Sequence, residues 1–138
     1  MAIFGIGAYY DQDVSAQFIE NNIAGPGWGQ DQAPELFQYI ASLKVGDIVY
    51  IKSCSAASKD IHVKGIGFVA DHRLLTSEED TRGLVSAGRR INWINRERFV
   101  IPKPQEKNNV RSNTIYEEFH PEIQRIIMSK VVGAVKST

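Results

Sequence analysis

Three strand-like segments follow one another in the middle of this chain with no full helix between them, and their order restricts the fold most strongly. They cover residues 48–53, 61–71 and 91–101. A doubly wound parallel sheet requires strands and helices to alternate regularly. The sequence therefore predicts an α+β domain, with a curled mixed sheet or a small barrel flanked by helices.

Four helices are expected around this strand-rich region, two before it and two after it. The first covers 13–22, and the second starts near Pro34, because proline suits the first helical turn. Thr114 and Glu117 have the spacing of a capping box, which predicts a short third helix. Pro121 is expected to open the last helix.

The length of 138 residues suits one domain with a substantial core, so a single domain over 1–138 is expected. Cys54 is the one cysteine, which excludes an internal disulfide and fits a reducing compartment. The sequence has no apolar run near the roughly 18 residues of a membrane span, and its first residues do not resemble a signal peptide. We therefore expect a cytoplasmic protein without a membrane partner.

Charge is unevenly distributed although the formal net charge is zero. Residues 1–40 contain five acidic residues and no lysine or arginine, whereas residues 89–111 contain seven basic residues and two acidic ones. A basic segment of this kind can supply phosphate contacts to a nucleic acid. The alternative is a solvated charged face without a ligand.

Glycines and aromatic residues are interspersed in two segments near the N-terminus. Residues 4–10 read FGIGAYY within the expected first strand, and residues 25–29 read GPGWG. Glycine lets a ligand approach the backbone, and aromatic rings provide flat apolar faces. Together they predict a slot for a planar ligand such as a nucleobase, walled by Trp28 and by Tyr9 or Tyr10. Neighbouring strand residues point to opposite faces, so at most one of the two tyrosines enters the slot.

The sequence patterns predict no catalytic residue, no metal site and no bound cofactor. The three histidines have no ligand spacing with one another or with Cys54. The paired glycines lack the G-x-G-x-x-G register, and no Walker-type lysine follows them. These observations argue against a dehydrogenase, a kinase or an NTPase. A hydrolase built from carboxylates distant in sequence stays open, because the fold sets such pairs.

Several blocks, taken in order, resemble the PUA-like superfamily and most closely its EVE-type domains. The GPGWG segment and a helix precede residues 43–53 (LKVGDIVYIKS), 61–69 (IHVKGIGFV) and 91–96 (INWINR). The shared pattern is a Gly-Asp pair entering an apolar strand, then a glycine-bearing strand, then a strand with an aromatic residue. The resemblance covers about residues 3–101. It implies a pseudo-barrel with an aromatic-lined pocket that holds a modified nucleobase flipped out of DNA or RNA.

The candidate ligand site has three groups of residues. The flat faces are expected from Tyr9, Tyr10 and Trp28. The groups for the base edge or an adjacent phosphate are Lys52, Ser53 and Asn92. The backbone phosphate contacts are Arg89, Arg90 and Arg96. Each group also has a structural interpretation, as a packed loop, a polar strand end or a solvated face. Asn92 and Trp93 face opposite ways in a strand, so Trp93 belongs to the core if Asn92 lines the site. The sequence leaves this choice open.

The leading hypothesis for function is a non-catalytic module that recognises a nucleobase, modified or unmodified, in DNA or RNA. A second hypothesis is a receptor for a small free nucleotide or signalling molecule, in which the basic segment is incidental. An enzyme acting on a base or nucleotide is the third. Steep weakening by salt would distinguish the first hypothesis from the second, because only a nucleic acid offers several phosphates.

Overall fold

The computed structural model describes residues 1–10, 12–26, 34–53, 60–76, 85, 87–102 and 114–136, with residues 9, 10, 12 and 76 described by their backbone only. Its elements, in chain order, are β1 Ile3–Gly7, β2 Tyr9–Tyr10, β3 Gln12–Asp13, α1 Ser15–Asn21, β4 Ile23–Ala24, α2 Pro34–Ser42, β5 Ile48–Ser53, β6 Asp60–Val69, β7 Leu75–Thr76, β8 Ala87–Asn95, β9 Phe99–Pro102, β10 Ile115–Glu117 and α3 Pro121–Lys136.

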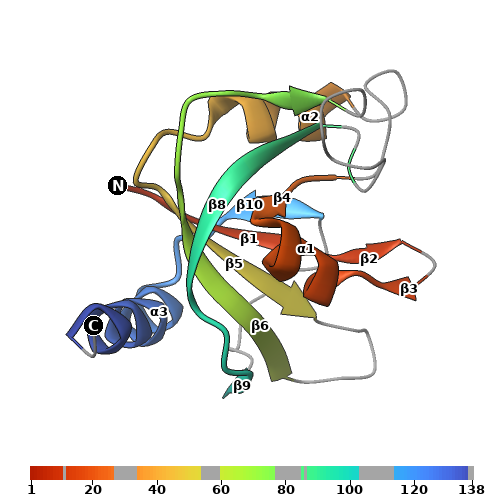
Figure 1. Cartoon of the computed structure of the whole chain (residues 1–138). Helices are drawn as coiled ribbons and strands as arrows, with labels where there is room; N and C mark the ends of the chain where they lie inside the picture. Colours follow the sequence, from red (N-terminus) through yellow and green to blue (C-terminus); the bar gives the residue numbers. More distant parts are fainter. Residues whose placement is uncertain are drawn as a thin grey trace.

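Eight of the described strands form one strongly curled sheet, which gives the fold a half-barrel shape (Figure 1). The strand order is β10-β1-β5-β6-β8-β4, with β9 paired to β6 and β7 paired to β8. β1 and β5 run parallel, and the other paired strands run antiparallel. β2 and β3 form a separate hairpin. The predicted α+β class, a curled mixed sheet with helices around it, is therefore confirmed.

β6 is the long central strand, and irregular pairing on both of its edges accounts for much of the curl. The register shifts at Ile51/Lys52 in the pairing with β5 and at Ile66/Gly67 in the pairing with β8. Such β-bulges bend a strand and increase its twist. A Cβ at Gly67 would lie 2.7 Å from the backbone oxygen of Asn92, so glycine is what allows β8 to approach this closely.

The sheet separates two apolar clusters, each covered by helices. α1 and α2 lie on one side of the sheet and α3 lies on the other (Figure 1). Phe18 of α1 and Ile40 of α2 are fully buried in the first cluster. Ile123, Ile127 and Val131 of α3, spaced by one helical turn, are buried in the second. Both sides of the central strands are therefore apolar, as expected for a sheet covered on two faces.

Gly5 of β1 makes room for a buried hydrogen-bond network, which explains one of the glycines in the FGIGAYY segment. Its strand neighbours are Tyr50 and Tyr116, and a Cβ on Gly5 would lie 2.5 Å from the hydroxyl of Tyr116. The two tyrosine hydroxyls lie 2.8 Å apart, and that of Tyr50 donates to the carboxylate of Glu118 at 2.9 Å. Burial, together with Tyr116 and Glu118, raises the pKa of Tyr50 far above its ordinary value. The space above Gly5 is thus filled by the protein's own rings.

Three local predictions are wrong. Residues 114–117 form no helix, because Ile115–Glu117 is strand β10, paired antiparallel with β1. The single strand expected over 91–101 is two strands, β8 and β9, which pair with different parts of β6. The first strand ends at Gly7 instead of continuing to residue 10. In contrast, the helices that start at Pro34 and Pro121 begin where the sequence predicts.

Candidate functional site

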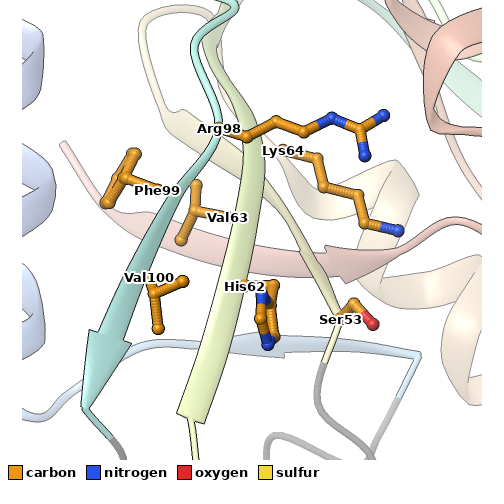
Figure 2. Close-up of a pocket in the computed structure, with 7 residues that line it drawn as sticks. All are labelled: Ser53, His62, Val63, Lys64, Arg98, Phe99 and Val100. Atoms are coloured by element: carbon orange, nitrogen blue, oxygen red, sulfur yellow. The ribbon is translucent and has the colours of Figure 1, made fainter.

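The strongest candidate site among the described residues is an open depression where β5 ends beside β6 and β9 (Figure 2). We call it the first depression, and its volume is about 400 Å³. The residues that line it are Ser53, His62, Val63, Lys64, Arg98, Phe99 and Val100. This volume falls within the range of about 300–1,000 Å³ typical of small-molecule sites.

Strand pairing places the polar side chains of this depression together. Ser53 pairs with His62, and His62 pairs with Val100 on the other side of β6. Because side chains alternate along a strand, His62 and Lys64 point away from the core while Val63 is fully buried. Figure 2 shows Lys64 and Arg98 extending to the same side of the strands.

Lys64 also ties the first depression to the β2–β3 hairpin. Its ammonium group donates to the Oδ2 atom of Asp13 at 2.7 Å, while the Oδ1 atom of Asp13 accepts the backbone N–H of Ser15 at 2.9 Å. Partial burial opposes ionisation of Asp13, but the hydrogen bonds from Lys64 and Ser15, together with the charge of Lys64, outweigh it and lower the pKa of Asp13 to about 2. The hairpin that carries Tyr9 and Tyr10 is therefore anchored beside the depression.

Lys52, Ser53 and Asn92, expected to address the base edge together, lie apart. Ser53 lines the first depression, whereas Lys52 points to the opposite face of β5, with its Nζ atom 5.6 Å from the centre of the Tyr116 ring. Asn92 is exposed and pairs with Phe68, six residues along β6 from His62, the partner of Ser53. At 3.3 Å per strand residue this separation is about 20 Å. Ser53 is thus the member of this group that contributes to the first depression.

Arg89 serves the core, and we remove it from the expected phosphate contacts. It is 2% exposed, and its guanidinium donates to the backbone oxygens of Ile40, Leu43 and Asp71. Burial lowers the pKa of Arg89 from its ordinary value, although Asp71 and Asp47 oppose this effect. A side chain held in this way does not reach a ligand at the surface.

The other two arginines remain near the surface but at different places. Arg90 is half-buried and pairs with Ile23 of β4. Arg96 is exposed in the short connection between β8 and β9. The three arginines of the predicted phosphate set therefore do not form one cluster.

The predicted aromatic walls fall outside the described side chains. Trp28 lies outside the described residues, and Tyr9 and Tyr10 are placed by their backbone in β2. Trp93, in contrast, is clearly a core residue: it is buried, and its indole N–H donates to the backbone oxygen of Phe18 at 3.0 Å. The sequence leaves open which of Asn92 and Trp93 belongs to the core. The structure shows that Trp93 does, since Asn92 faces solvent.

Sequence reasoning missed His62, Lys64 and Arg98 as candidate site residues. One signal was available, because polar His62 and Lys64 alternate with apolar Ile61 and Val63. Such alternation indicates a strand with one face directed away from the core. The approach of β9, which brings Arg98 to this face, has no comparable signal in the local sequence.

Two further properties concern the described part of the chain. Its His, Cys, Asp and Glu side chains form no group of three that could hold a metal ion. Among its helices, none has the length and apolar character needed to cross a membrane.

No protein-family model matches this chain, and no curated protein is significantly similar to it.

Proposed function

We propose that this protein is a non-catalytic nucleic-acid-binding module of the PUA-like, EVE-type class that recognises a nucleobase, modified or flipped out of its strand. The observation that carries the proposal is the first depression, whose lining includes Lys64 and Arg98 together with the hydroxyl of Ser53 and the imidazole of His62. These groups suit a phosphate and the edge of a base. The anchored β2–β3 hairpin brings Tyr9 and Tyr10 to the same end of the half-barrel.

Simple energetics explain why such a site needs both rings and cations. Stacking a base on an aromatic side chain contributes about 1–3 kcal/mol. Extracting a paired base from a duplex costs a few kcal/mol, and less when the base is damaged or unpaired. One ring therefore roughly balances extraction, and net affinity has to come from phosphate contacts and edge hydrogen bonds. Arg98, which is exposed, is the described residue best placed to make the phosphate contact, because the ammonium group of Lys64 already donates to Asp13.

A receptor for a free nucleotide is the second candidate function, and the size of the first depression favours it. A volume of about 400 Å³ accommodates one nucleotide without requiring a longer strand. A free-nucleotide receptor would bind a mononucleotide as tightly as an oligonucleotide containing the same base. A nucleic-acid module would bind the oligonucleotide more tightly and with a steeper dependence on salt.

Oligonucleotide binding tests the proposal directly. We expect Arg98→Glu to weaken binding to oligonucleotides carrying unmodified, 5-methyl, 5-hydroxymethyl or N6-methyl bases to a similar extent, because it removes a phosphate contact. Trp28→Ala should instead reduce the discrimination among these bases. Fluorescence anisotropy at two salt concentrations measures both effects.

Lys44→Glu provides the matched control, because Lys44 is exposed and precedes β5, at the opposite end of that strand from Ser53. It should leave affinity and discrimination close to those of the unaltered protein. If Arg98→Glu and Lys44→Glu behave alike, or if no oligonucleotide binds, the proposal is wrong.

A further inference from the structure

We infer that the bound nucleic acid is a strand of several nucleotides, which leaves the first depression, crosses the β8–β9 connection and makes a second set of phosphate contacts against α3. This inference rests on the proposed function and specifies its ligand. It is carried by a second depression, in whose lining Arg96 is the one residue that the sequence analysis expects at a site.

The second depression lies between the C-terminal end of β8 and the C-terminal half of α3. Its volume is about 480 Å³, and it is lined by Ile94, Asn95, Arg96, Glu97, Ser129, Lys130, Gly133 and Ala134. Arg96 and Lys130, one from each wall, are both exposed. Two cations against the single carboxylate of Glu97 give its lining a net positive charge.

The two depressions adjoin each other across the β8–β9 connection. The Nζ atom of Lys130 lies 4.8 Å from the centre of the Phe99 ring, and Phe99 also lines the first depression. Arg96 and Arg98 belong to the second and the first depression, respectively, and two residues of chain span at most about 7 Å. Figure 2 shows Phe99 pointing to the opposite side of the strands from Lys64 and Arg98, so Lys130, beside the Phe99 ring, and these two cations flank the β8–β9 connection from its two sides.

Two local features shape the second depression. The side-chain oxygen of Asn95 accepts the backbone N–H of Glu97 at 2.9 Å, which fixes the turn that carries Arg96. Gly133 lies in the α3 wall, and a Cβ there would meet no atom within 4 Å. A glycine inside a helix is less favourable than alanine. Here it leaves one position of the α3 wall without a side chain.

The physical consequence is a footprint longer than one nucleotide. A mononucleotide can use one depression, whereas an extended strand can contact cations in both. Each phosphate contact on a single strand adds about 0.7 to the slope of log affinity against log salt. Loss of the contacts at Arg96 and Lys130 should therefore reduce that slope by about 1.4.

The test compares the double variant Arg96→Gln/Lys130→Gln with the unaltered full chain. The ligands are a mononucleotide and a single-stranded oligonucleotide of about 12 nucleotides, a length within the usual range of single-strand sites. The double variant should keep its affinity for the mononucleotide and bind the oligonucleotide more weakly. Between about 50 and 200 mM salt, its oligonucleotide affinity should fall about sevenfold less than that of the unaltered protein.

The control is Lys44→Gln/Lys136→Gln, which removes two exposed lysines that do not line either depression. Thermal unfolding of both double variants establishes that they are folded. If the oligonucleotide binds but the two double variants show the same affinity and salt slope, the inference is overturned and the proposed function survives. If the mononucleotide binds as tightly as the oligonucleotide, the inference is wrong and the free-nucleotide receptor is favoured. If neither oligonucleotide nor mononucleotide binds, the proposed function fails together with the inference.

Discussion

Replacing Arg89 with methionine is expected to lower the free energy of unfolding by about 3–5 kcal/mol, although a positive charge is removed from an apolar interior. The guanidinium donates to the backbone oxygens of Ile40, Leu43 and Asp71, at 3.1 Å for Ile40 and 2.8 Å for Asp71. Ile40 lies in the last turn of α2, and Leu43 follows that helix directly. Carbonyl groups at a helix C-terminus have no partner within the helix. Arg89 therefore acts as a C-terminal cap supplied by a distant strand.

The size of the effect follows from what methionine leaves behind. Each buried carbonyl that loses its partner costs about 1–3 kcal/mol, and the cation also interacts favourably with the negative end of the α2 dipole. Methionine retains much of the side-chain volume, so little of the loss comes from a cavity. Urea denaturation measures the change.

Arg90→Met is the matched control, because Arg90 is the next residue of β8, points to the opposite face and is half-buried. Its substitution should change stability by less than about 1 kcal/mol. An Arg89→Met variant with near-normal stability and weakened nucleic-acid binding would contradict the structural role and restore the phosphate interpretation of Arg89.

Gly25→Ala is expected to destabilise the fold by about 3 kcal/mol, the upper end of the range for overpacking. Gly25 follows β4, whose residues Ile23 and Ala24 pair with β8. A Cβ on Gly25 would lie 1.9 Å from the backbone oxygen of Ala87 and 2.8 Å from the Cα atom of Gly88. Backbone atoms of a paired strand cannot rotate aside as a side chain can. The alanine methyl group should therefore push β4 away from β8.

Gly133→Ala is the control variant, and its change in stability is expected to have the opposite sign. A Cβ at this position meets no neighbour, and the position lies within α3. It should stabilise the protein by about 0.5–1 kcal/mol. Thermal and urea unfolding of the two variants compare the same chemical change in two environments. Equal stability of Gly25→Ala and the unaltered protein would show that the close contact with Ala87 is not required.

The same contact changes the interpretation of the GPGWG segment. The sequence pattern predicts that glycine at its first position lets a ligand approach the backbone. The structure instead requires it for the approach of β8. Gly27, Trp28 and Gly29 lie outside the described residues, so their proposed role at the ligand stays a prediction.

Elements governed by local chemistry were predictable from the sequence. Gly46 adopts a positive φ of 90°, and the carboxylate of Asp47 accepts the backbone N–H groups of Ala2 and Lys44. A Gly-Asp pair before an apolar run is the signal for such a turn into a strand. The apolar spacing of α3 likewise predicts which side of that helix is buried.

Elements governed by distant partners were not predictable. Thr114 and Glu117 have helical capping spacing, yet Glu117 pairs with Phe4 at the edge of the sheet, more than a hundred residues earlier in the chain. Local propensity is a weak guide where tertiary pairing competes with it. Arg89 shows the same limit, because its role depends on carbonyl groups more than forty residues earlier in the sequence. A basic residue in a strand gives no local sign that a helix end will enclose it.

Photo-crosslinking a single-stranded oligonucleotide with a reactive base to the full chain, followed by peptide mapping, tests most directly whether nucleic acid lies across the two depressions. The predicted adducts fall on peptides that contain Ser53, residues 62–64 or residues 94–100, and on the α3 peptide that contains Lys130. Adducts confined to α2 or to the segment around Lys44, with these peptides unmodified, would contradict the proposed site.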